Sequence, residues 1–358
     1  MASKPASART LAFDVLLRVE GGAYASDLLA AHSAALDARD AGLASEIVFG
    51  VLRYRAQLDY LIEYYSGRRQ KLDAEVRTVL RMGIYQLRYL DRVPAHAAVA
   101  ESVEQVKRAR KRSAAGFVNA VLRKVNRDPV PWPSREVELS CPAWLLERWE
   151  RHYGADAAVA IARAALQEPV KYTRGDRVQD IGSQSIVPLL NLCSGQRFLD
   201  LCAAPGNKTA QALESGVQVV ACDLHYHRIA PVKPLTPNLV VLDGTRPLPF
   251  AGRFDRILVD APCSGTGTLG RNPEIKWRLS PADLDDLRLR QTALIGNARA
   301  ALAPAGLLVY STCSLEPEEN EGVVAELPAR CGCVQRSLLR LPGRDPGDGF
   351  FAAVITSV

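Results

Sequence analysis

The sequence predicts two domains of different fold class, an all-α bundle followed by an α/β domain with a parallel sheet. The chain has 358 residues, more than a single domain usually holds. Over residues 1–127 the apolar residues recur at helical spacing, and nothing alternates as a strand would. From Val178 onward, short apolar runs alternate with helical segments, which is typical of βαβ units. We therefore predict a bundle over residues 1–135, a helical linking segment over 136–177 and the α/β domain over 178–358.

Four helices make up the predicted bundle. Apolar residues at helical spacing mark the first over residues 11–19 and the second over 76–87. Asp73 stands just before the second helix and is a candidate N-cap. Two more helices follow Pro94, around residues 97–106 and 117–125. The proline-rich residues 128–134 then form a natural linker, and a further helical stretch covers 144–166.

The charge is distributed unevenly between the two halves. Residues 1–135 carry 22 Lys+Arg and 14 Asp+Glu, a net charge of +8, whereas residues 136–358 carry 23 and 25, a net charge of −2. A basic front half indicates a polyanionic partner such as a nucleic acid, and the alternative is a solvated surface that happens to be basic.

One basic cluster lies between the third and fourth predicted helices. Its cations also suit the C-terminal end of a helix dipole, but their position in an already basic domain favours contact with phosphates. The predicted RNA-binding residues are Lys107, Arg108, Arg110, Lys111 and Arg112.

Composition and cysteine usage exclude several classes of protein. The chain is 48% hydrophobic and 23% charged, as globular proteins usually are. No apolar run approaches membrane-spanning length and the N-terminal sequence lacks a signal-peptide pattern, so we expect a cytoplasmic protein with no membrane partner. The eight cysteines include no CxxC pair and the five histidines are scattered, so we expect neither a metal site nor disulfides.

The first strand of the α/β domain, residues 197–201, runs into a turn of small residues and then a helix. Small residues let a ligand approach the backbone, and N–H groups at a helix start are free to donate. The next strand ends in Asp223, 23 residues after Asp200, where an acid suits the ribose hydroxyls of an adenosine cofactor. Asp243 and Asp260 end two further strands, so we expect the three acids on one ligand-binding edge. The turn comprises Cys202, Ala203, Ala204, Pro205, Gly206, Asn207 and Lys208.

Two cysteines are predicted at the same edge. Cys263 follows Pro262 directly after one strand, and Cys313 directly follows the strand GLLVY. Each alone could be a small buried residue, but together beside a cofactor pattern they indicate thiol chemistry. Methylation at carbon 5 of a pyrimidine needs a reactive thiol, because a thiolate that adds to carbon 6 makes carbon 5 electron-rich. Asp260 is placed to hydrogen-bond the cytosine ring, and a second group must help to release the adduct.

Three segments carry a resemblance to a known family. DLCAAPGNKT, VDAPCSGTGTLGRNPEIKWR and YSTCSLEPEENEGVV resemble the motifs of bacterial RNA 5-methylcytosine methyltransferases of the Sun/Fmu/NOL type. MGIYQLRYLDRVPAHAAVAESVEQVKRARKRSAAGFVNAVLRKV resembles a NusB-like RNA-binding domain, and the ending GRDPGDGFFAAVI also fits. This pairing is characteristic of small-subunit (16S) ribosomal RNA cytosine-5 methyltransferases. The resemblance implies a NusB-like bundle and a Rossmann-like class I methyltransferase domain. It also implies S-adenosylmethionine as cofactor, a monomeric state, and RNA, specifically small-subunit rRNA, as partner.

The resemblance also implies a role for each site residue. Cys313 would be the nucleophile and Cys263 would assist release. Spacing alone does not show which of the two cysteines is the nucleophile, because DNA cytosine methyltransferases use the Pro-Cys cysteine. The turn 202–208 would wrap the cofactor, with Lys208 facing the active site. Of the acids, Asp223 would hold the ribose, Asp243 would lie by the adenine and Asp260 would sit between cofactor and cytosine.

The chain departs from the family pattern in three places. Asn207 stands where the family usually has Gly, and Asn tolerates the left-handed conformation better than most residues. Pro231, Pro234 and Pro237 stand where the family continues a helix, so we expect this wall of the cofactor site to be shortened. KYTRGDRVQDIGSQ directly joins two segments that the family separates with a small RNA-contacting subdomain.

Two alternative functions follow from these departures and from the limits of the motifs. The same chemistry could act on tRNA rather than rRNA. The chain could also be an RNA-binding assembly factor with impaired catalysis, although both cysteines and all three acids remain.

Overall fold

The computed structural model describes residues 7–67, 71–327 and 334–356. It divides into two compact units. The first comprises Met1–Glu168 with Gly270–Arg278, and the second Pro169–Leu269 with Leu279–Val358. Among the described residues, no helix has both the length and the apolar character that a membrane span requires.

The first unit is built of helices, as predicted. The apolar residues that predicted the first helix are all buried on α1; they are residues 11, 15, 16 and 19. A buried Arg81 pairs inside this bundle with Asp59 at 2.7 Å and with Glu20 at 2.6 Å. The helices are α1 (Ala8–Glu20), α2 (Ala25–His32), α3 (Ala38–Arg53), α4 (Arg55–Ser66), α5 (Ala74–Tyr89), α6 (Ala95–Arg108), α7 (Ala115–Leu122), α8 (Arg135–Glu138), α9 (Ala143–Tyr153), α10 (Ala155–Ala164) and α14 (Ile275–Arg278), with 3₁₀ turns η1 (Ser33–Ala35) and η2 (Arg112–Ala114).

Residues 270–278 belong to the helical unit although they are far along the chain. The buried Lys276 donates its Nζ to the carbonyl of Arg53 at 2.9 Å, and Trp277 donates its Nε1 to the carbonyl of Leu52 at 2.7 Å. Glu274 Oε1 accepts the N–H of Ala25 at the start of α2 at 3.0 Å. Hydrogen bonds to backbone groups therefore fix this segment on α2 and α3.

The second unit contains a seven-stranded sheet in the order β5-β4-β3-β6-β7-β9-β8. The strands from β5 to β7 are parallel, and β9 is antiparallel to both β7 and β8. The bounds are β3 (Arg197–Asp200), β4 (Gln218–Asp223), β5 (Leu239–Val241), β6 (Phe254–Asp260), β7 (Leu302–Thr312), β8 (Val334–Arg340) and β9 (Phe350–Thr356), with a separate hairpin of β1 (Thr173–Arg174) and β2 (Arg177–Val178).

The expectation of a parallel sheet is wrong for β9, which runs antiparallel to both of its neighbours, β7 and β8. β9 is buried over nearly its whole length and is therefore a continuous run of apolar residues. Such a run does not show whether the strand is parallel or antiparallel to its neighbours. β8 is mostly exposed and carries no apolar run, which is why the sequence did not indicate it.

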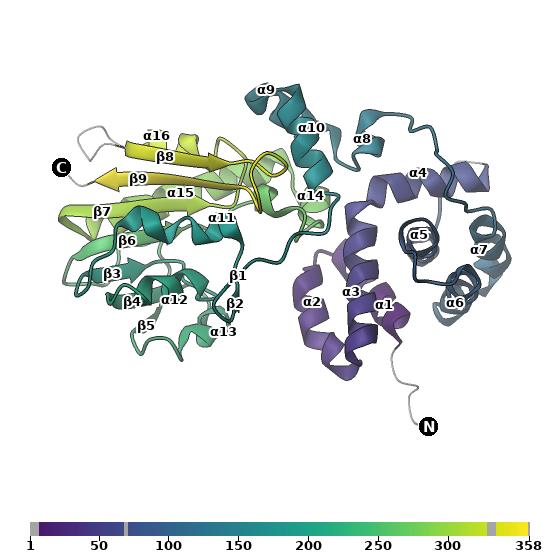
Figure 1. Cartoon of the computed structure of the whole chain (residues 1–358), viewed down its shortest axis with the longest axis horizontal. Coiled ribbons are helices and arrows are strands. Elements are labelled where there is room, and N and C mark those ends of the chain that lie inside the picture. The colour runs from purple at the N-terminus through teal and green to yellow at the C-terminus, as the bar shows by residue number, and fades with distance from the viewer. Residues whose placement is uncertain (1–6, 68–70, 328–333, 357–358) are drawn as a thin grey trace. The chain divides into compact units, whose positions relative to one another are not determined.

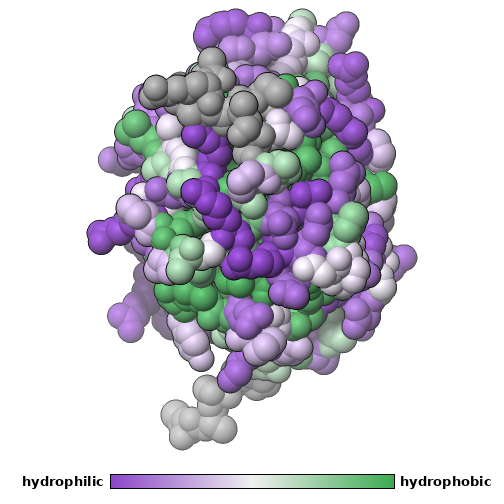
Figure 2. Space-filling view, turned by 90° about the vertical axis from the view of Figure 1, so that its left-hand side faces the viewer, coloured by the Kyte–Doolittle hydropathy of each residue, from purple (hydrophilic) through white to green (hydrophobic). Residues whose placement is uncertain are grey.

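Helices cover both faces of the sheet, giving three layers (Figure 1). Successive strand residues point to opposite faces: Phe198 packs in a core with Ala212 of α12, and Leu199 packs in a second core with Leu294 of α15. On the face of the molecule in Figure 2, hydrophobic residues lie among hydrophilic ones. The helices of this unit are α11 (Ile181–Gln184), α12 (Asn207–Leu213), α13 (Tyr226–Ile229), α15 (Pro281–Ala300) and α16 (Glu321–Ala325), with 3₁₀ turns η3 (Val187–Leu190), η4 (Ala230–Val232) and η5 (Thr266–Thr268).

Candidate active site

The carboxyl ends of the parallel strands carry the predicted site residues. Asp200, Asp223 and Asp260 are the last residues of β3, β4 and β6, and Cys313 directly follows β7. These strands are parallel neighbours, so their ends meet at one edge of the sheet. Asp243 comes two residues after β5 ends.

The turn 202–208 joins β3 to α12. Gly206 has φ 103°, and a Cβ there would lie 3.0 Å from Val232, so both the backbone conformation and the space favour glycine. Asn207 is the first residue of α12 and is not among the residues with positive φ. The expectation that tolerance of the left-handed conformation matters at Asn207 is therefore wrong, because Gly206 takes that conformation. The Asn207 side chain instead donates to the carbonyl of Val178 at 3.0 Å.

Asp223 stands against this turn. Its Oδ2 accepts the N–H of Ala204 at 3.3 Å, and its Oδ1 accepts the N–H of His225 at 3.2 Å. The following helix, α13, has only four residues, because Pro231 soon follows, as the prolines predicted. Further along, Asp243 Oδ1 accepts hydrogen bonds from Thr245, which lower the pKa of Asp243.

Asp200 lies beneath the turn and is fully buried. Its Oδ2 accepts the hydroxyl of Thr209 at 2.7 Å, and its Oδ1 has no hydrogen-bond partner among the described residues. Burial raises the pKa of Asp200 from 3.8 to about 7. An unpartnered buried acceptor, a glycine turn at a helix start and the acid of β4 together fit an adenosine cofactor with a cationic amino-acid part.

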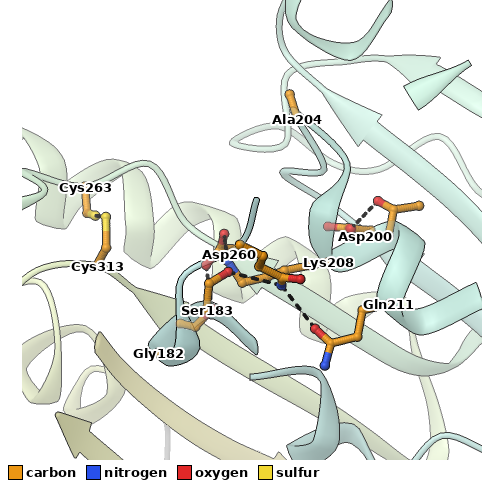
Figure 3. A network of polar contacts seen from close by, with 12 residues as sticks. Gly182, Ser183, Asp200, Ala204, Lys208, Gln211, Asp260, Cys263 and Cys313 are labelled. Carbon is orange, nitrogen blue, oxygen red and sulfur yellow. Dashed lines mark hydrogen bonds and ion pairs between the residues drawn. The ribbon is translucent and has the colours of Figure 1, made fainter. Parts of the chain in front are cut away.

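Asp260 is held by two donors. Its Oδ2 accepts from Lys208 Nζ at 2.6 Å; Figure 3 labels both residues. Its Oδ1 accepts the hydroxyl of Ser311 at 2.8 Å. The sequence indicated Asp260 and Lys208 separately; their ion pair and the contribution of Ser311 are visible only in the structure. The side chain of Asp260 keeps 28% of its surface exposed and so is accessible to a substrate.

The two predicted cysteines point toward one another, with their sulfur atoms 3.4 Å apart (Figure 3). Both are partly exposed and free of disulfides. The hydrogen bond to Cys313 and burial together raise the pKa of the Cys263 thiol, and the charge of Glu319 adds to this. Cys263 therefore keeps its proton and can donate it in a hydrogen bond to the sulfur of Cys313.

Behind the cysteines lies a buried polar network that the sequence did not indicate. The carboxylate of Glu319 accepts hydrogen bonds from Ser264 and Ser314, the residues that follow Cys263 and Cys313. All three are buried. The motif YSTCSLEPEEN contains both Ser314 and Glu319, but spacing alone does not show which of its acids contacts the two serines.

The basic cluster of residues 107–112 lies at the end of α6 and the start of η2. Lys107 pairs with Glu104 at 2.7 Å, and Lys111 pairs with Asp73 at 2.8 Å. Asp73 stands at the N-cap position of α5, but its side chain makes no cap hydrogen bond. Within this cluster, Arg108, Arg110 and Arg112 are exposed and form no ion pair among the described residues.

A Rossmann-like sheet with a glycine turn after its first strand, and reactive side chains at its carboxyl edge, defines an α/β enzyme domain of the class that binds an adenosine cofactor. Comparisons with known proteins narrow this class of protein to a family. Residues 187–335 match the family model for the 16S rRNA methyltransferase RsmB/F, and residues 6–127 match the NusB family.

Full-length relatives agree with these matches. The chain is 30% identical to the probable ribosomal RNA small subunit methyltransferase B of Bacillus subtilis (strain 168), over 90% of this chain and 88% of that protein. It is 33% identical to the ribosomal RNA small subunit methyltransferase B of Klebsiella pneumoniae (strain 342), over 96% and 97%. The crystal structure of PH0851 shares the fold, with a TM-score of 0.74 over 99% of each chain at 20% identity. The chain therefore belongs to the family of ribosomal RNA small subunit methyltransferase B, and it is an S-adenosylmethionine-dependent RNA methyltransferase.

Proposed function

We propose that the protein transfers a methyl group from S-adenosylmethionine to carbon 5 of a cytosine in small-subunit (16S) rRNA, through a covalent bond between Cys313 and the cytosine. One observation carries the proposal: two thiols 3.4 Å apart lie at the same sheet edge as the ion pair of Asp260 and Lys208. The substrate follows from the family, whose relatives carry rRNA in their names.

The cofactor would be held by the turn and by two acids. Bound S-adenosylmethionine would supply an electrophilic methyl group. Asp223 would accept hydrogen bonds from the ribose hydroxyls, and the free Oδ1 of Asp200 would accept one from the cationic amino group. The N–H groups of 202–208 would face its polar parts.

Cys313 acts as the nucleophile. Its sulfur adds to carbon 6 of the cytosine, and the ring becomes an enamine whose carbon 5 is nucleophilic. A hydrogen bond from the Cys263 thiol orients the sulfur of Cys313. Asp260 accepts a hydrogen bond from the polar edge of the cytosine, and Lys208 with Ser311 fixes its carboxylate in that orientation.

Cys263 then serves in release. Once Cys313 is bonded to carbon 6 it is a thioether, so the main cause of the raised pKa of Cys263 is removed. Cys263 can then lose its thiol proton to solvent, and the resulting thiolate accepts the proton of carbon 5. The electrons of that C–H bond restore the ring double bond, and the bond from carbon 6 to the sulfur of Cys313 breaks.

The test uses wild-type protein, Cys313→Ala and Cys263→Ala with labelled S-adenosylmethionine and unmodified small-subunit rRNA. We expect label in RNA with wild type and a loss of at least about 10³-fold with Cys313→Ala, because the covalent route is removed. We expect Cys263→Ala to leave a protein–RNA adduct that survives denaturation. Full methylation by Cys313→Ala would contradict the mechanism.

Two further arms separate the alternatives. Unmodified tRNA is assayed beside the rRNA, and preferential label in tRNA would assign the same chemistry to another substrate. Calorimetry with S-adenosylmethionine addresses catalysis itself. RNA binding without any cofactor binding or label would identify an RNA-binding assembly factor instead.

A further inference from the structure

Glu319 is a buried carboxylate that the reaction described above does not use. Its side chain is fully inaccessible, and it forms no ion pair among the described residues. A buried charge without a cation is costly unless hydrogen bonds satisfy it. At Glu319, four donors do so.

These donors come from three separate parts of the second unit. Glu319 Oε1 accepts the N–H of Ser264 at 2.8 Å and the side-chain amide of Gln291 on α15 at 2.9 Å. Glu319 Oε2 accepts the hydroxyls of both Ser264 and Ser314. Its own carbonyl accepts the hydroxyl of Tyr310 on β7 at 2.6 Å, so its backbone is fixed as well.

Two of these partners are the chain neighbours of the reactive thiols. Ser264 follows Cys263, and Ser314 follows Cys313, and their hydroxyls are 3.0 Å apart. A single carboxylate therefore joins the two cysteine loops directly behind the sulfur atoms. We propose that Glu319 is a positioning residue that sets the distance between Cys313 and Cys263 for the reaction, an inference that rests on the proposed function.

The chemistry of the carboxylate explains why a neutral residue cannot replace it. Both oxygens of a carboxylate accept, whereas the amide of Gln has one accepting oxygen and a nitrogen that donates. In Glu319→Gln the amide nitrogen can face the two hydroxyls, which then have to turn away as acceptors. The hydrogen bonds that join Ser264 and Ser314 to one atom are thereby lost, and the connection between the loops beside the two cysteines is weakened.

The experiment compares wild type, Glu319→Gln and a matched control, Glu321→Gln. Glu321 is exposed and only two residues away. We expect Glu319→Gln to lower kcat about 10- to 100-fold, since misplacement of a reacting group by about 1 Å has an effect of this size. The KM for rRNA and the Kd for S-adenosylmethionine should change less than about threefold, and Glu321→Gln should match wild type.

A second measurement reports on the sulfur atoms themselves. In the Cys263→Ala background, Glu319→Gln should form the covalent Cys313–RNA adduct more slowly at saturating RNA and cofactor. Ser314→Ala and Ser264→Ala each remove one hydroxyl that donates to Glu319, and they serve if Glu319→Gln does not fold. When either serine change is combined with Glu319→Gln, the fold-loss in kcat should be smaller than the product of the two separate fold-losses, because all three residues act through one network.

The outcomes are distinct. Glu319→Gln activity and adduct formation equal to the Glu321→Gln control would overturn the inference, as would a loss confined to RNA affinity or to folding with kcat intact. If wild-type protein itself forms no adduct and methylates no RNA, the proposed function fails first, independently of Glu319.

Discussion

Asp200 shows how one residue can couple the cofactor site to pH. It is fully buried, with one carboxylate oxygen bonded to Thr209 and the other unpartnered among the described residues. Burial raises its pKa from 3.8 to about 7. Between these two values the folded protein holds a proton that the unfolded chain has released. The free energy of unfolding therefore falls as the pH rises from about 4 to about 7.

We predict that Asp200→Asn removes this dependence. The variant should match or fall slightly below wild type near pH 4 and should become the more stable protein toward pH 7.5. The relative gain should be on the order of 4 kcal/mol, from about 1.4 kcal/mol for each of about 3 pKa units. Urea denaturation across this pH range, without cofactor, measures it. The matched control is Asp176→Asn, an exposed carboxyl in the same unit. Parallel stability curves for Asp200→Asn and wild type would contradict the prediction.

Among the elements, the loops behind β6 and β7 are joined by backbone as well as by Glu319. Gly267 donates its N–H to the carbonyl of Cys313 at 2.9 Å, and its own carbonyl accepts the N–H of Gly349 at 2.8 Å. A Cβ at Gly267 would lie 2.4 Å from the carbonyl oxygen of Gly349 and 2.8 Å from that of Cys313. Both are backbone atoms, so a side-chain rotation cannot relieve the clash.

We predict that Gly267→Ala separates these loops. The second unit should lose about 1–3 kcal/mol of stability through overpacking, and methylation should fall with it. The control is Gly296→Ala on α15, where a Cβ meets nothing within 4 Å. That change should be neutral or should stabilise by up to about 1 kcal/mol, because alanine favours a helix over glycine. Thermal or urea unfolding of both variants, with methylation activity measured on each, tests this prediction. Unchanged stability and activity in Gly267→Ala would show that the loops tolerate a wider spacing.

The elements also show what the sequence could and could not predict. Helices with a clear apolar face, such as α1 and α5, follow from periodicity. Buried strands such as β6 and β7 follow from short apolar runs that alternate with helical segments. The exposed strand β8 and the antiparallel direction of β9 do not, because exposure removes the apolar pattern and burial of both faces removes the signal of direction.

The candidate site was predictable to a similar degree. Strand ends that carry acids and cysteines could be placed on one edge, because parallel strands share that edge. Contacts between those ends could not, since they depend on how loops fold back. The ion pair of Lys208 with Asp260, the free oxygen of Asp200 and the inward turn of Glu319 each required the structure.

At the scale of the whole molecule, charge is divided between the halves of the chain. Residues 1–135 have a net charge of +8 and residues 136–358 a net charge of −2. The methyltransferase half must therefore rely on the helical half for most of its attraction to a polyanion. Within the predicted phosphate-binding cluster, the acid partners of Lys107 and Lys111 offset part of their charge, which leaves the exposed arginines as the principal contacts.

We predict that Arg110→Gln with Arg112→Gln weakens RNA binding through the loss of phosphate contacts. A plot of the logarithm of the binding constant against the logarithm of salt concentration should become shallower by about 1–2, since each lost phosphate contact reduces that slope by about 0.7–0.9. The matched control, Arg39→Gln with Arg92→Gln, removes the same charge from exposed positions elsewhere in residues 1–135. It should weaken binding only slightly and leave the slope nearly unchanged. Equal slopes for the two double variants would mean that the helical half attracts RNA through its overall charge and that residues 107–112 form no specific phosphate site.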